Sequence, residues 1–119
     1  MSDIKNLRTI EEILQWFKDS IDGDEIIQPS YWVEAALKLL VLMGSESDKL
    51  YTMQQEVAQI RAEMLGESDA TVSGVKIKVE ATDKYRLCRQ QEALIGRIEE
   101  FIRLAKLQAR LRQSEMSIG

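Results

Sequence analysis

Residues 29–43, PSYWVEAALKLLVLM, place apolar side chains around nearly the whole circumference of a helix. Pro29 suits the first turn of a helix, where a missing backbone N–H costs nothing, and only Glu34 and Lys38 carry charge within the stretch. A helix that is apolar on all sides is normally buried. The rest of a 119-residue chain offers too little surface to cover it, so we expect its far side to form a subunit interface.

The segment before this helix begins with a helix-capping signal. Thr9 and Glu12 have the capping-box spacing, in which each residue's side chain binds the backbone N–H of the other. Apolar residues then recur at helical spacing as far as Ile21. The pattern predicts a helix over residues 10–21 that stops at Gly23 in the left-handed conformation.

After residue 43, Gly44 is expected to break the helix, and Ser45 with Asp48 to cap a third helix over residues 46–65. Apolar residues there alternate at spacings of three and four, the seam of a coiled coil, which requires a partner helix. Three residues of the preceding helix and this seam form the candidate interface: Trp32, Leu37, Leu40, Leu50, Met53, Val57, Ile60 and Met64.

Residues 75–81, VKIKVEA, alternate apolar and charged side chains with the period of a strand. We favour a helix here because the chain offers no convincing second strand. A short strand, paired within the chain or across a dimer, stays as the alternative. The signal from residue 81 onward is strongly helical, which predicts one helix over 73–112, antiparallel to 46–65. The predicted fold is all-α, a single domain over residues 1–119 formed by a small helical bundle with a long antiparallel helical hairpin.

Charge is divided unevenly along the chain. Residues 1–69 hold 14 acidic and 6 basic side chains, whereas residues 70–119 hold 6 acidic and 10 basic. This division has two explanations: the two halves attract each other, within the fold or across a subunit contact, or the basic half binds an anionic partner. Because the basic residues are spread around the C-terminal helix, we favour the first explanation over nucleic-acid binding. The candidate anion-binding residues are Arg86, Arg89, Arg97, Arg103 and Arg110.

The chain contains no histidine, which removes the commonest general base and metal ligand. Cys88 is the single cysteine, so it supports neither a zinc site nor an intrachain disulfide. Arg86 and Arg89 could activate its thiol, but a small core residue is the favoured interpretation. We therefore expect no enzymatic activity, no catalytic residues, no cofactor and no metal.

Two absences bear on location. Residues 1–8 lack the apolar core of a signal peptide, so we expect no export by that route. The most apolar run, residues 39–43, is far shorter than the roughly 20 residues that cross a bilayer. We therefore expect no membrane span, and a single cysteine favours a reducing compartment.

Three segments, residues 29–39, 79–85 and 98–106, resemble small, mostly uncharacterised helical proteins of tailed bacteriophages. The resemblance implies a viral origin, with the bacterial host cytoplasm or the virion as the setting. The excess of apolar helix surface favours a non-enzymatic interaction or assembly protein that forms a homo-oligomer or binds a host or virion protein. The alternative is a DNA-associated accessory of phage replication or recombination that uses the basic C-terminal helix.

Overall fold

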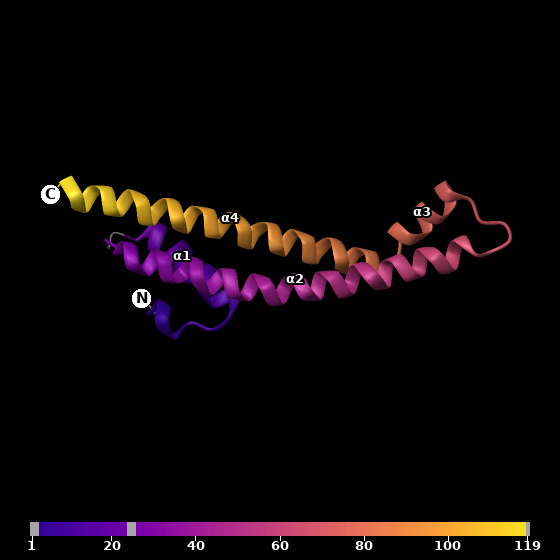
Figure 1. Cartoon of the computed structure of the whole chain (residues 1–119), viewed down its shortest axis with the longest axis horizontal. Helices are drawn as coiled ribbons and strands as arrows, with labels where there is room; N and C mark the ends of the chain where they lie inside the picture. The colour runs from indigo at the N-terminus through magenta and orange to yellow at the C-terminus, as the bar shows by residue number, and fades with distance from the viewer. Residues whose placement is uncertain (1–2, 24–25, 119) are drawn as a thin grey trace. The chain divides into compact units, whose positions relative to one another are not determined.

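The computed structural model describes residues 3–23 and 26–118, and no strand occurs among them. The elements are η1 (Ile4–Asn6), α1 (Ile10–Asp22), α2 (Pro29–Leu65), α3 (Val72–Glu80) and α4 (Asp83–Ile118) (Figure 1). The two long helices, α2 and α4, pack against each other as a helical hairpin. The all-α prediction is confirmed, and residues 75–80 belong to a helix. No helix in the described ranges combines the length and apolarity needed to span a membrane.

The chain divides into two compact units. Unit 1 contains Met1–Met43 and Arg97–Gly119, and unit 2 contains Gly44–Gly96. Both α2 and α4 continue from one unit into the other. Each unit has its own buried side chains, so each is described separately below.

Aromatic rings join α1, α2 and α4 in the core of unit 1. Trp16 and Phe17 of α1 each meet the Trp32 ring edge-on, with both pairs of centroids 5.1 Å apart. Phe17 also meets Phe101 of α4 at 4.9 Å and nearly perpendicular. Edge-to-face contacts of this kind favour one relative orientation of the rings. The cluster therefore fixes how α1 lies against the hairpin in this unit.

The start of α1 follows the predicted capping box. Thr9 Oγ1 accepts a hydrogen bond from the Glu12 amide at 3.2 Å, and Glu12 Oε1 accepts one from the Thr9 amide at 3.1 Å. The hydrogen bonds from Thr9 lower the pKa of Glu12. The predicted left-handed conformation of Gly23 is wrong, because its φ is −81° and its ψ is 161°. Its amide still donates to the Asp19 carbonyl, but the chain then leaves α1 in an extended direction.

The predicted break at Gly44 is also wrong, because α2 is one helix of 37 residues. A glycine in a helix interior costs only about 1 kcal/mol relative to alanine. The burial of α2 residues before and after Gly44 in the chain, such as Leu39 and Val57, outweighs that cost. Ser45 and Asp48 lie inside the helix, and a capping box requires Glu or Gln three residues after the cap, whereas this site has Asp.

The predicted single helix over residues 73–112 is instead α3 and α4, with a break at Ala81 and Thr82. The Thr82 hydroxyl accepts a hydrogen bond from the Tyr85 amide at 3.2 Å and donates one to the Val79 carbonyl at 2.7 Å. The same side chain thus caps the start of α4 and binds the end of α3. This double role turns the chain between the two helices.

The seam that begins at Leu50 contacts helices of its own chain in unit 2. The core of this unit is formed by Val57 of α2, Val75 and Val79 of α3, and Cys88 of α4. The other four seam residues are partly buried and pack against this core: Leu50, Met53, Ile60 and Met64. The partner helix that the seam requires is therefore supplied largely by α3 and α4.

Candidate interaction surface

In unit 1, α2 has one buried and one exposed apolar side. Trp32, Ala35 and Leu39 are almost completely buried. The exposed side carries four large apolar residues, which we call the α2 face. Their side chains are 47 %, 54 %, 50 % and 76 % exposed at Val33, Leu37, Leu40 and Val41 respectively. The described residues of unit 1 thus leave a substantial part of this apolar helix uncovered.

The candidate interface residues from the sequence fall into three groups. Trp32 lies in the core of unit 1, because its indole packs between Trp16 and Phe17. Leu37 and Leu40 belong to the exposed α2 face. The five seam residues from Leu50 to Met64 pack within unit 2, as described above. Sequence reasoning missed Val33 and Val41, since a helix that is apolar all round does not reveal which side faces the core.

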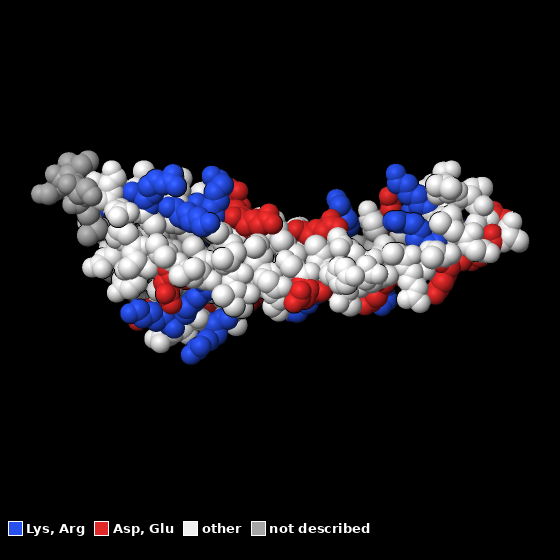
Figure 2. Space-filling model, viewed as in Figure 1, with Lys and Arg blue, Asp and Glu red and all other residues white. Residues whose placement is uncertain are grey.

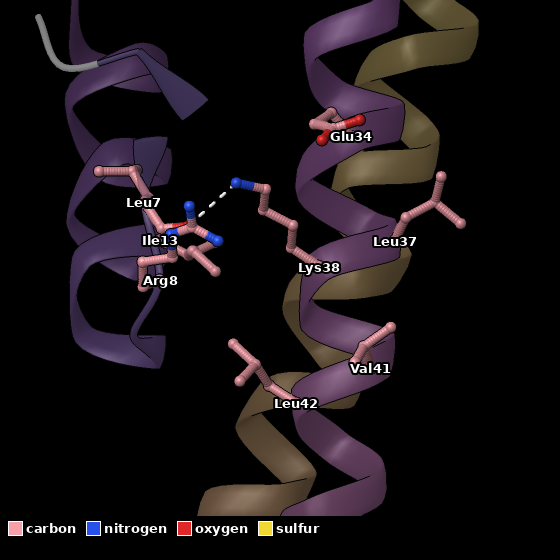
Figure 3. A pocket seen from close by; sticks show the side chains of 8 residues that line it. All are labelled: Leu7, Arg8, Ile13, Glu34, Leu37, Lys38, Val41 and Leu42. Atoms are coloured by element: carbon pink, nitrogen blue, oxygen red, sulfur yellow. Dashed lines mark hydrogen bonds between the residues drawn. The ribbon is translucent and has the colours of Figure 1, made fainter. Parts of the chain in front are cut away.

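A groove of about 360 Å³ lies between α2 and the segment before α1 (Figure 3). Ile13 of α1 contributes to one wall, and the charged side chains of Arg8 and Glu34 lie on opposite walls. The groove is mainly apolar and continuous with part of the α2 face. Its lining residues are Leu7, Arg8, Ile13, Glu34, Leu37, Lys38, Val41 and Leu42.

Lys38 joins the two walls of this groove. Its Nζ atom donates hydrogen bonds to the backbone carbonyls of Ile4, Lys5 and Leu7, at 2.6, 2.9 and 2.9 Å. Figure 3 shows the side chain reaching from α2 toward Leu7. The ammonium group thereby supplies donors to three backbone carbonyls in and just after η1, of which the Ile4 carbonyl also accepts from the Leu7 amide. The only sequence signal for this role was a lone lysine in an otherwise apolar helix.

The candidate anion-binding residues lie on α4 but in both units. In unit 2, Arg86 forms an ion pair with Asp83 at 3.7 Å, and Arg89 forms one with Glu92 at 2.9 Å. Both pairs are local and exposed, and such pairs contribute little to stability. The charges of these two arginines are thus partly compensated by their own helix.

In unit 1, Lys and Arg side chains gather over the C-terminal part of α4 (Figure 2). Arg103 forms an ion pair with Glu100 on the same helix. Arg97 and Arg110 are exposed and form no ion pair with the described side chains. The five arginines therefore do not converge on one concave site.

The predicted attraction between the acidic and basic helices has one clear instance in unit 2. The Lys84 ammonium of α4 forms an ion pair with Glu56 of α2. Both side chains are about half exposed, so the pair favours the register of the hairpin more than its stability.

Cys88 is 5 % exposed, and burial raises the pKa of its thiol. The favoured interpretation as a core residue is therefore correct, and activation by Arg86 and Arg89 is not. Among residues 3–23 and 26–118, no three Cys, Asp or Glu side chains are grouped so that they could hold a metal ion. A comparison with known protein families, curated proteins and solved structures found no match.

Proposed function

We propose that this protein is a non-enzymatic helical interaction protein that assembles through the α2 face with a second copy of itself. The observation that carries the proposal is the row of four large apolar side chains, each about half exposed or more, on one side of α2. Contiguous apolar surface of this kind commonly marks an interaction site.

The pattern of the α2 face favours a second copy as the occupant. Val33, Leu37 and Val41 are spaced by four residues and therefore lie on one side of the helix. Most homo-oligomers use closed two-fold symmetry, in which the same patch faces itself. An antiparallel pairing centred on Leu37 would set Val33 of each copy against Val41 of the other. This arrangement brings apolar side chains together, with Glu34 and Lys38 along one edge of the row.

The expected strength of this pairing is modest. Complete burial of a large aliphatic side chain contributes about 1.5–3 kcal/mol, and these four side chains are already partly covered. Association must offset an estimated 4–15 kcal/mol of lost translational and rotational freedom. We therefore expect a weak, reversible dimer whose population rises with concentration rather than an obligate one.

The resemblance to helical proteins of tailed bacteriophages supports a host cytoplasm or virion as the proposed setting. A host or virion protein with an apolar helix could use the same face. Binding to such a partner and self-association would then compete for Leu37 and Leu40.

The test is sedimentation velocity of the full chain over a range of concentrations. We expect the wild type to associate reversibly and Leu37→Gln to remain monomeric, because a polar amide would be buried in the contact. Leu87→Gln is the matched control, since Leu87 is similarly exposed but lies on α4 in unit 2. A wild type that stays monomeric throughout, or equal association of both variants, would contradict the proposal.

DNA association is the second candidate. Arg103, Lys106 and Arg110 follow spacings of three and four, so they lie along one exposed side of α4 in unit 1. Filter binding at several salt concentrations tests it. Retention of DNA that falls steeply with salt, and that is lost in Lys106→Gln/Arg110→Gln, would favour this function over self-assembly. No salt-dependent retention would exclude it.

A further inference from the structure

The segment before α1 packs against unit 1 although it has little regular structure of its own. It comprises residues 3–8, which we call the strap, and its only helical part is the single turn η1. Ile4 and Leu7 of the strap are buried. Within η1, the Asn6 amide donates to the Asp3 carbonyl and the Leu7 amide to the Ile4 carbonyl. One isolated turn cannot sustain itself in water, so the strap depends on what holds it to the helices.

Lys38 supplies three hydrogen bonds to the strap from a single atom. The acceptors are the carbonyls of Ile4, Lys5 and Leu7, which lie 31 to 34 residues away in the sequence. An ammonium group carries three N–H donors and no acceptor, so these three carbonyls match its full capacity. Hydrogen bonds from a charged donor are stronger than neutral ones.

We propose that the Lys38 ammonium is a latch that holds the strap on unit 1, and that the strap detaches as a local unit when the ammonium donors are removed. The strap provides one wall of the groove through Leu7 and Arg8, while α1 and α2 provide the rest. Its release therefore removes that wall and opens the groove beside Leu37 of the α2 face. The latch sets how much apolar surface unit 1 presents, and it does not depend on whether the α2 face self-associates.

A detached strap has a specific signature in amide hydrogen exchange. In Lys38→Met, which keeps the length of the side chain without its donors, we expect the Asn6 and Leu7 amides to exchange at least tenfold faster. The Ile102 amide, in the α4 part of unit 1, should keep its protection. Lys49→Met is the matched control, because Lys49 is an exposed lysine of the same helix that contacts Glu46. That variant should leave exchange in the strap unchanged.

Chemical rescue separates hydrogen-bond donation from charge alone. Propylammonium replaces the atoms missing from Lys38→Ala, so it should restore slow exchange at Asn6 and Leu7. Tetramethylammonium has the same charge but no N–H group, so it should not restore it. Unchanged strap exchange in Lys38→Met, an equal rise at Ile102, or rescue by tetramethylammonium to the same extent would each overturn the proposal.

Discussion

Gln91 of α4 donates hydrogen bonds from Nε2 to both the backbone carbonyl and a carboxylate oxygen of Glu46 on α2, at 2.9 and 2.6 Å. The two residues are 45 positions apart in the sequence and lie together in unit 2. One amide thus recognises two acceptors of the same residue. This geometry fixes the register of α4 against α2 in a way that apolar packing alone does not.

The substitution Gln91→Ala should lower the free energy of unfolding by about 1–2 kcal/mol, because a largely covered carboxylate and a carbonyl both lose a donor. Urea unfolding followed by circular dichroism measures the change. Gln90→Ala is the control, since Gln90 is the exposed neighbour. Equal losses in both variants would show that the two hydrogen bonds contribute nothing specific.

Glu46 should contribute less to the free energy of unfolding at acidic pH than at neutral pH. The hydrogen bond from Gln91 is the main cause that lowers the pKa of Glu46, with Lys49 adding to it. A carboxyl with a lowered folded pKa stabilises the fold above its unfolded pKa, about 4.5, and this stabilisation is lost as the pH falls through the folded pKa.

The stability difference between the wild type and Glu46→Gln should therefore be constant near neutral pH and shrink below about pH 4.5. Unfolding titrations at a series of pH values measure it. The same titrations on Glu67→Gln, an exposed acid beyond the end of α2, provide the baseline. A difference that stays constant down to about pH 3, below the ordinary carboxyl range, would contradict the assigned role of Gln91.

Substitution of glycine by alanine should change the stability of the protein differently at Gly74 than at Gly44 and Gly96. An added Cβ at Gly44 or Gly96 meets nothing within 4 Å, so each substitution should stabilise the protein by about 0.5–1 kcal/mol. At Gly74 the Cβ would lie 2.8 Å from Thr71 Oγ1, the hydroxyl that caps α3. Gly74→Ala should therefore give no gain. Thermal unfolding of the three variants tests the pattern, and a destabilised Gly44→Ala would show that α2 needs flexibility there.

The sequence was sufficient to predict those structural features that depend only on residues close together in the chain. The Thr9 and Glu12 capping box and the start of α2 at Pro29 are local, and both were predicted correctly. Gly44 was misread because the local preference of glycine is overruled by the burial of α2 residues before and after it in the chain. The break at Thr82 was missed because Tyr85 stands where a capping box would have Glu or Gln.

The candidate site was only partly predictable for a similar reason. The excess of apolar residues on α2 indicated that one apolar side of the helix stays exposed. Which side that is depends on where α1 and α4 pack against α2. Lys38 was recognised only as a charged exception, since its three acceptors come from a distant segment with no sequence signal. The periodicity of apolar residues does not predict contacts between residues that are far apart in the chain.

Cys88 should react slowly with a thiol reagent in the folded protein, because it is buried and its pKa is raised by that burial. The rate of reaction with Ellman's reagent, compared with the rate in urea, measures its accessibility. We expect the folded rate to be lower by at least tenfold, as a buried thiol requires local opening. Rates that are equal with and without urea would contradict its place in the core of unit 2.

Disulfide crosslinking tests the central claim, pairing of the α2 face with a second copy, most directly. In a Cys88→Ala background, Leu37→Cys brings two thiols together at the proposed two-fold axis, whereas Leu87→Cys, similarly exposed, does not. The account predicts that mild oxidation converts Leu37→Cys to a covalent dimer much faster than Leu87→Cys at equal concentration. Equal rates of dimer formation for the two variants would contradict it.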